Sequence, residues 1–339
     1  MKQVTLYPGA KINIGLYVFE KRADNFHEIE SIFYPVGADN SNLTPDKLTV
    51  TILQTPQEAS LFLSDETAST AQNQDQNFHP EDETAFIAQN QDRNFHPEDE
   101  TASTAQNQDS GSCPEKVRMI ETGLEYPGKP EDNICVKAYN LLDADFDLPP
   151  AVISLEKHLP TGAGLGGGSS DGVCTLRALN ELCDLHLTEA QLMSYAAKLG
   201  SDCPFFVRNE PMLVTGRGEI LTPLTGAAIS KALKNLRENY TFQIIFSPDC
   251  FVSTKKAYSI VPKRSKKDKL QAPYIPMTEL VTEPVETWQG RIVNDFEAPV
   301  FNEFPQLQKV KDSLIETGAA YVSMTGSGSA IFGLFPIND

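Results

Sequence analysis

A run of small residues at Pro160–Asp171 limits what this chain can fold into more than any other feature. It contains five glycines and two serines, follows an apolar strand-like segment at 152–157, and leads into a helical pattern. Glycines let backbone N–H groups converge on an anion, and the N-terminus of the following helix adds a partial positive charge. A plain tight turn would need fewer glycines. The run therefore predicts a phosphate-binding loop.

Two better-known glycine motifs do not fit this loop. No lysine precedes Ser169 and Ser170, so the G-x-x-x-x-G-K-[ST] signature is absent. The dinucleotide fingerprint requires surrounding parallel βαβ units, and the sequence around the loop lacks them.

Strand and helix patterns are mixed along the chain, which predicts an α+β protein. Strands are expected at 4–6, 11–19, 152–157, 242–246 and 330–335, and helices at 133–142, 170–183 and 188–199. The first two strands lie on either side of a Pro8-Gly9 turn. A capping box at Thr188 and Gln191 begins the last of these helices, and Gly200 ends it.

The strand at 11–19 carries the first candidate catalytic group, Lys11. Apolar residues alternate along it at positions 12, 14, 16 and 18, which predicts one buried face with Lys11 and Asn13 on the other. An ordinary solvated lysine is the alternative interpretation, because most surface lysines are of that kind.

Length and composition allow two globular domains, which we expect at residues 1–212 and 213–339. No apolar run approaches the roughly 20 residues of a membrane-spanning helix, and the N-terminus does not resemble a signal peptide. The six cysteines form no C-x-x-C pair, which favours reduced thiols and a cytoplasmic location.

The net charge of −18 argues against nucleic-acid binding, which depends on clustered basic residues. Eleven acidic residues and one basic residue lie between 65 and 109, so this segment contributes −10 and the rest of the chain −8. The segment is a tandem repeat of 17 residues, with Ala-Gln-Asn-Gln-Asp at 71–75, 88–92 and 105–109. Its composition cannot bury enough apolar surface to offset chain ordering. We therefore expect an insertion at about 56–113 that is disordered or leaves the surface loosely.

Asp202 is the second candidate catalytic group. It follows the helix-ending Gly200 and precedes Pro204, so it could simply cap the next helix. The alternative is a general base, held near a bound hydroxyl by the apolar residues Phe205 and Phe206.

A second glycine-rich run lies at 324–329, between two apolar segments. It could be a hairpin turn without further function. Its six small or flexible residues exceed the needs of a tight turn, so close approach of the backbone to a ligand is also possible.

Together these segments resemble the GHMP kinase family, and the match extends over nearly the whole chain. The matching motifs are Ala10–Asn13, Arg22–Glu28, Pro160–Asp171, Leu199–Phe206, Gly216–Glu219, Asn294–Glu297 and Met324–Ser329. The stretches at 22–28 and 294–297 point to a member that phosphorylates a cytidine-bearing alcohol. The resemblance implies an N-terminal ATP-binding α+β domain, a ferredoxin-like C-terminal domain, and a monomer or homodimer.

The resemblance also implies roles for individual residues. Asp202 would take the proton from the substrate hydroxyl, Lys11 would stabilise charge nearby, and magnesium would bridge the phosphates with Ser170 as a candidate contact. The residues implied at ATP are Pro160, Gly162, Ala163, Gly164, Leu165, Gly166, Gly167, Gly168, Ser169 and Ser170. Those implied at the cytidine-bearing substrate are Asn13, Phe26 and His27.

The chain departs from the family pattern near its substrate residues. Asn25-Phe26 stand where Gly-Tyr is usual, so we expect retained binding with one polar contact fewer. Another family member acting on a different alcohol is one alternative function. A phosphate-binding module without activity is another, although it would need neither Lys11 nor Asp202.

Overall fold

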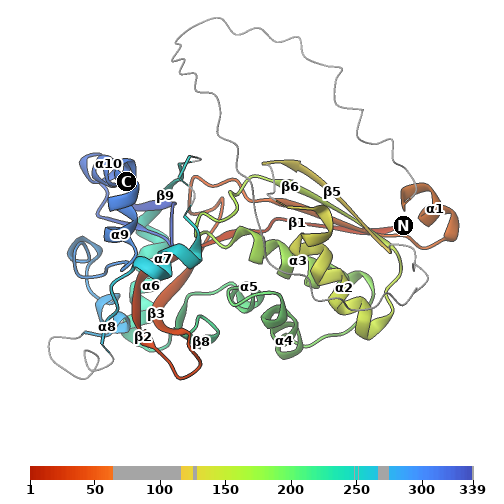
Figure 1. Ribbon diagram of the computed structural model, residues 1–339, viewed down its shortest axis with the longest axis horizontal. Helices are drawn as coiled ribbons and strands as arrows, with labels where there is room; N and C mark the ends of the chain where they lie inside the picture. Colours follow the sequence, from red (N-terminus) through yellow and green to blue (C-terminus); the bar gives the residue numbers. More distant parts are fainter. Residues whose placement is uncertain (64–115, 125–127, 248, 251, 266–274, 338–339) are drawn as a thin grey trace, which may run out of the picture.

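The computed structural model describes residues 1–63, 116–124, 128–247, 249–250, 252–265 and 275–337. One sheet lies at one end of the molecule (Figure 1). Its order is β1 (Lys2–Leu6), β4 (Lys47–Ile52), β6 (Ala151–Lys157) and β5 (Val117–Gly123), and β5 and β6 run parallel. The helices α2 (Ile134–Phe146) and α3 (Gly167–Leu182) pack on this sheet, and α4 (Glu189–Leu199) and α5 (Cys203–Arg208) pack on these helices.

A second sheet is central to the protein. Its order is β2 (Ala10–Lys21), β3 (His27–Val36), β7 (Met212–Gly216) and β8 (Ile220–Pro223), with antiparallel pairs throughout. One face of this second sheet packs on α5 and on the helices that pack with the first sheet. The other face packs on the C-terminal elements. Strand β7 begins at the expected domain boundary and pairs with β3, so residues on both sides of position 212 build this sheet.

The C-terminal part contains a third sheet in the order β10 (Tyr321–Met324), β11 (Ile331–Pro336) and β9 (Tyr240–Ile245). The helices here are α6 (Ala227–Asn239), α7 (Thr254–Ile260), α8 (Met277–Leu280), α9 (Glu297–Glu303) and α10 (Pro305–Glu316). Short 3-10 helices lie at Pro130–Asp132 and Val285–Thr287.

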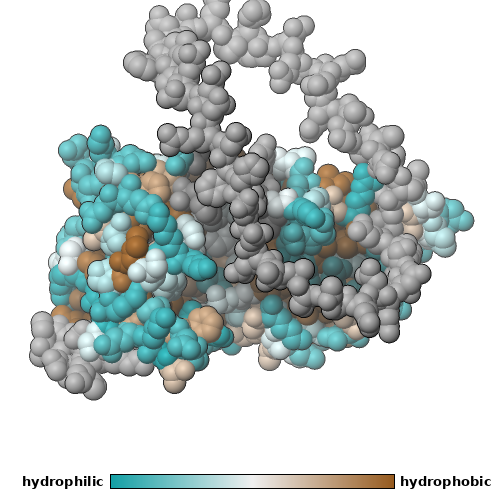
Figure 2. Space-filling view, in the orientation of Figure 1, coloured by the Kyte–Doolittle hydropathy of each residue, from teal (hydrophilic) through white to brown (hydrophobic). Residues whose placement is uncertain are grey.

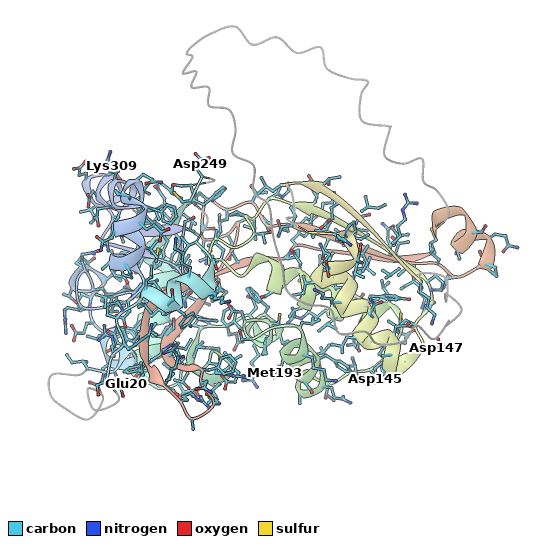
Figure 3. All side chains as sticks on the ribbon, viewed as in Figure 1. Glu20, Asp145, Asp147, Met193, Asp249 and Lys309 are labelled. Atoms are coloured by element: carbon cyan, nitrogen blue, oxygen red, sulfur yellow. The ribbon has the colours of Figure 1, made fainter. Side chains whose placement is uncertain are left out.

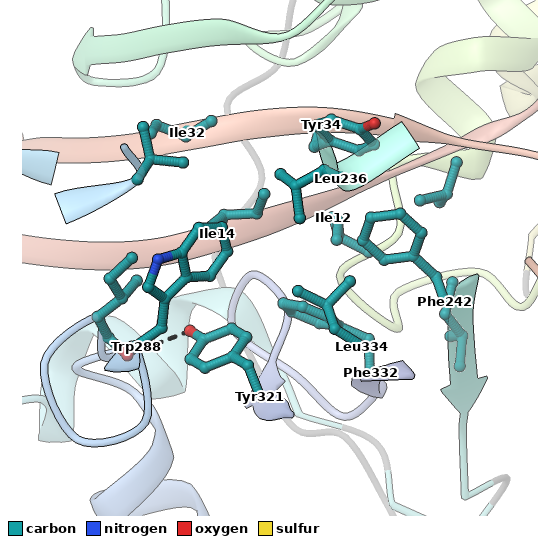
Figure 4. Close-up of a cluster of buried hydrophobic side chains, with 14 of the residues drawn as sticks. Ile12, Ile14, Ile32, Tyr34, Leu236, Phe242, Trp288, Tyr321, Phe332 and Leu334 are labelled. Atoms are coloured by element: carbon teal, nitrogen blue, oxygen red, sulfur yellow. Dashed lines mark hydrogen bonds between the residues drawn. The ribbon is translucent and has the colours of Figure 1, made fainter. Parts of the chain in front are cut away.

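A continuous apolar core joins the second and third sheets (Figure 4). Ile12, Ile14 and Ile32 project from the second sheet toward Phe332 and Leu334 of the third sheet. Close packing of this kind fixes the position of β2 relative to the C-terminal elements. On the face shown in Figure 2, hydrophilic residues predominate over small, separate apolar patches. Among the described residues, no helix is long and apolar enough to cross a bilayer.

The α+β class is confirmed, and most expected elements are present within a few residues. Helix α3 begins at Gly167 rather than near residue 170, and the capping box of Thr188 with Gln191 begins α4. Side-chain contacts join these helices: Asp145 near the end of α2 (Figure 3) accepts a hydrogen bond of 2.6 Å from Tyr195 of α4.

The two strands expected around Pro8-Gly9 are present as β1 and β2, and they belong to different sheets, because β1 pairs with β4. Two sequence-based expectations need correction. The alternation along β2 breaks at Gly15, where a register shift and a φ of 71° mark a bulge. Leu16 and Val18 therefore pack in a separate cluster from Ile12 and Ile14.

The second correction concerns the start of the expected insertion. Residues Pro56–Leu63 form helix α1 and are not an irregular excursion. The hydroxyl of Thr55 accepts a hydrogen bond from the Glu58 N–H, and the Glu58 carboxylate accepts one from the Thr55 N–H, which is a reciprocal arrangement at the helix start. The repeats at 71–109 lie outside the described residues.

Candidate active site

The glycine-rich loop runs from the end of β6 to the start of α3. Gly166, with φ of 70°, is the N-cap residue of α3, and no side chain among the described residues caps this helix. Its first turn therefore offers backbone N–H groups and a helix dipole to an anion. A Cβ on Gly168 would meet no atom within 4 Å, so this part of the loop borders open space.

Lys11 lies directly against this loop. Its backbone N–H donates to the Leu165 carbonyl over 2.8 Å, and a Cβ on Gly166 would lie 3.2 Å from the Lys11 Cγ. The side chain is only 4% exposed, so the solvated interpretation is wrong. Burial lowers the pKa of Lys11, and the neighbouring Asp202 opposes this shift. A buried ammonium at this position is a strong source of positive potential.

Asp202 faces the lysine from the start of α5. Its Oδ2 lies 3.5 Å from the Lys11 Nζ, and its side chain is 33% exposed. Asp202 occupies the N-cap position of α5, but its carboxylate makes no capping hydrogen bond. The capping interpretation is therefore not supported, and the carboxylate remains available to a substrate hydroxyl.

Asn13 lies beside Lys11 on β2 and is 1% exposed. Its Oδ1 accepts a 2.7 Å hydrogen bond from the Lys11 Nζ, and its Nδ2 donates to the Ser31 hydroxyl over 2.8 Å. In this structure Asn13 thus orients the lysine. Its expected contact with substrate stays a prediction.

A buried ionic cluster lies beneath the loop. Lys157, at the end of β6, donates to Asp46 and, over 2.9 Å, to Asp171 near the start of α3. Asp46 also accepts from the backbone N–H groups of His158 and Leu159. Burial raises the pKa of Asp171 to about 8, against the opposing effect of Lys157. The cluster ties the two ends of the glycine loop to the segment before β4.

The second glycine-rich run is a hairpin connection, because it joins the antiparallel strands β10 and β11. It also packs directly on the first loop. A Cβ on Gly164 would lie 2.2 Å from the Thr325 carbonyl oxygen, and Ala330 N–H donates to the Ala163 carbonyl over 3.1 Å. The glycines here allow two backbones to touch, which explains their number without a ligand.

A groove of about 710 Å³ lies near the turn between β2 and β3. Phe26, His27, Tyr258 and Arg217 are among its lining residues. Phe26 is 53% exposed, and the Arg217 guanidinium lies 4.8 Å from its ring centroid. The His27 and Tyr258 rings stack with centroids 5.6 Å apart. The groove is therefore suited to a planar ring, because aromatic faces line it.

Asp202 lies near this groove. Burial and then the Asp202 charge raise the pKa of Tyr258 to about 12, and a Cβ on Gly218 would lie 4.0 Å from the Asp202 Oδ1. The Nδ1 of His27 donates to the Phe19 carbonyl over 2.9 Å. In the neutral ring, Nε2 is then a hydrogen-bond acceptor.

The structure brings together Lys11, Asn13, Asp202 and the 160–170 loop, as the sequence predicted, with Phe26 and His27 on an adjoining groove. Sequence reasoning missed Tyr258, Asp46 and Lys157, and it gave Thr325 no role of its own although Thr325 lies in the 324–329 run. No motif marked the first three, because each reaches the site through packing between segments distant in sequence.

The described residues contain no cluster of three or more His, Cys, Asp or Glu side chains able to hold a metal. Magnesium commonly takes one or two protein groups and otherwise water and substrate phosphates. Ser170, the expected contact, lies in the first turn of α3 and is 3% exposed.

The chain matches two family models of known proteins. Residues 133–210 match the GHMP kinases N terminal domain, and residues 282–338 match the GHMP kinases C terminal domain. A 4-diphosphocytidyl-2-C-methyl-D-erythritol kinase from Bacteroides thetaiotaomicron is 36% identical over 330 residues, which covers 97% of this chain and 91% of that protein. The corresponding Bacteroides fragilis protein is 34% identical over 329 residues, with the same coverage of both chains.

Solved structures share the fold. A crystal structure of 4-(cytidine 5'-diphospho)-2C-methyl-D-erythritol kinase superposes with a TM-score of 0.62 at 24% identity, covering 98% of this chain and 90% of that chain. The Methanococcus jannaschii mevalonate kinase superposes with a TM-score of 0.52 at 10% identity, covering 98% and 91%.

Proposed function

Because the chain belongs to the 4-diphosphocytidyl-2-C-methyl-D-erythritol kinases of the GHMP kinase family, we propose that its site transfers the ATP γ-phosphate to the 2-hydroxyl of that alcohol with Asp202 as base. It is an ATP-dependent kinase of the non-mevalonate route to isoprenoid precursors. The proposal for the site rests on one observation: the Asp202 Oδ2 lies 3.5 Å from the buried Lys11 Nζ, beside the glycine loop.

The charges are suited to phosphoryl transfer, which depends mainly on positioning and electrostatic stabilisation. The partly exposed Asp202 carboxylate accepts the proton of the substrate hydroxyl while the oxygen of that hydroxyl forms a bond to the γ-phosphorus. The bond between that phosphorus and the bridging oxygen breaks, and ADP leaves. Lys11 stabilises the negative charge that builds up on the phosphoryl oxygens, and its burial strengthens this interaction.

The nucleotide phosphates lie on the backbone of residues 160–170. The uncapped N-terminus of α3 supplies N–H donors, and the open space beside Gly168 gives the phosphates room. Ser170, in the first turn of α3, would be the protein contact of a magnesium ion, which would supply positive charge to the nucleotide phosphates.

The aromatic groove takes the cytosine ring. Phe26 and Tyr258 supply ring faces for stacking, and the His27 Nε2 accepts a hydrogen bond from the exocyclic amine of cytosine. Phe26 lacks a hydroxyl, so the ring is held with one polar contact fewer than a tyrosine would give. Use of ATP supports the cytoplasmic location expected from the sequence.

ADP release coupled to a reporter enzyme tests the function. The cytidine diphosphate substrate, mevalonate and homoserine are compared at equal concentrations. Turnover is expected with the cytidine diphosphate substrate, and equal or faster turnover with either of the other alcohols would refute the assignment. ATP binding without turnover on any of them would leave only a phosphate-binding module.

A further inference from the structure

Thr325 is a fully buried polar residue for which the proposed mechanism has no role. It lies in the hairpin between β10 and β11 and is 0% exposed. Its hydroxyl accepts a 3.0 Å hydrogen bond from the backbone N–H of Asn13. It also lies 3.1 Å from the Gly164 carbonyl and 3.2 Å from the Asn13 Oδ1, to one of which it donates. A single hydroxyl therefore joins the C-terminal hairpin, strand β2 and the phosphate loop.

The Thr325 hydroxyl gives the backbone N–H of Asn13 a hydrogen-bond partner that the second sheet does not supply. β2 pairs with β3 and is an edge strand of the second sheet, so its other edge needs partners outside the sheet. The Thr325 hydroxyl supplies one at Asn13. Asn13 in turn accepts the hydrogen bond of the Lys11 ammonium, so one residue separates Thr325 from the proposed catalytic lysine.

The hairpin itself is held in place by Asn294. Its Nδ2 donates to the carbonyls of Met324 and Gly326, over 2.7 and 2.9 Å, on either side of Thr325. Its Oδ1 accepts from the Phe296 N–H over 3.0 Å. Asn294 is 3% exposed, so these bonds are shielded from water. The position of the Thr325 hydroxyl is thus fixed by the C-terminal elements.

We propose that Thr325 is a positioning residue for phosphoryl transfer, acting through Asn13 on Lys11 and through Gly164 on the phosphate loop. This inference rests on the proposed function, because it concerns the same lysine and loop. It assigns the C-terminal hairpin a part in holding the catalytic ammonium at the phosphate. Misplacement of a catalytic group by about 1 Å can lower the rate about a hundredfold.

The test compares Thr325→Val, which keeps the shape and removes the hydroxyl, with Thr325→Ser, which retains it. We expect Thr325→Val to lower kcat and kcat/KM together by about 10-fold to 100-fold at a temperature where the variant is fully folded. Thr325→Ser should keep most of the wild-type rate. Thr175→Val is the matched control, since Thr175 is also 0% exposed and its hydroxyl bonds to the Asp171 carbonyl and to the Cys135 thiol, not to β2 or the hairpin. It should alter stability without altering kcat.

Several results would overturn the inference. An unchanged kcat in Thr325→Val would show that the hydroxyl does not position the site, and so would an equal loss of kcat in Thr175→Val. Hydrogen–deuterium exchange of β2 provides a readout independent of turnover, with faster exchange at Asn13 expected in Thr325→Val but not in Thr325→Ser. If the wild-type enzyme fails to turn over the cytidine diphosphate substrate, the proposed function fails, and unchanged exchange at Asn13 would then separately refute the link through Thr325.

Discussion

Two glycines of the phosphate loop should respond in opposite ways to the same added methyl group. At Gly164, alanine would require a φ of 83° and place its Cβ 2.2 Å from the Thr325 carbonyl oxygen. Left-handed backbone costs a non-glycine residue about 1–2 kcal/mol. Separating the two loops would also weaken the Ala330–Ala163 and Thr325–Gly164 hydrogen bonds, at about 1 kcal/mol each. We expect Gly164→Ala to lower the free energy of unfolding by about 3–4 kcal/mol.

At Gly168, the added methyl group would meet no protein atom, and alanine is favoured over glycine in helices by up to about 1 kcal/mol. Stability should therefore be unchanged or slightly higher. The methyl group would occupy space that the phosphates need, so the KM for ATP should rise at least about tenfold, the equivalent of about 1.4 kcal/mol. Denaturant unfolding and steady-state kinetics measure both effects. A destabilised Gly168→Ala with normal ATP affinity, or a stable Gly164→Ala, would refute this description of the loop.

Two further predictions concern the charged and aromatic groups of the site. Lys11→Met should abolish transfer yet leave the free energy of unfolding at pH 7 equal or higher, because burial lowers the Lys11 pKa and the charged form therefore opposes folding below that pKa. The wild-type free energy of unfolding should rise toward pH 10 as the folded state loses this proton, whereas that of Lys11→Met should not. Chemical unfolding from pH 7 to 10 measures both proteins. A large loss of stability in Lys11→Met at pH 7 would contradict the prediction. Phe26→Tyr should retain substrate affinity, and Phe26→Ala should weaken it by the roughly 1–3 kcal/mol of one stacked base. Calorimetry with the cytidine diphosphate substrate measures this, with the exposed Phe146→Ala on α2 as control; equal affinity in Phe26→Ala would exclude stacking on this ring.

Local patterns in the sequence were sufficient for much of the site. The glycine loop was recognisable because glycines between a strand and a helix have a direct physical reason to be there. The same applies to the end of α4 at Gly200, which places Asp202 at the start of α5. The choice between a capping and a free carboxylate for Asp202 required the structure, since both interpretations need the same residue at the same position.

Interactions between distant segments could not be predicted from those patterns. The bond between Lys157 and Asp46 joins residues 111 positions apart, and Thr325 reaches Asn13 across 312 positions. The bulge at Gly15 was also missed, because a period-two pattern assumes an uninterrupted strand, and one extra residue exchanges the two faces. The burial of Lys11 results from the packing of three segments around it and has no local signal.

The central claim is that the Asp202 carboxylate takes the proton of the substrate hydroxyl at a phosphate held beside Lys11. Rapid-quench measurement of a single turnover, with enzyme in excess over radiolabelled ATP, tests it in the wild type and in Asp202→Asn. The account predicts phosphoryl transfer at least about a hundredfold slower in the variant, with unchanged binding of both substrates. A single-turnover rate within a few-fold of wild type would contradict it.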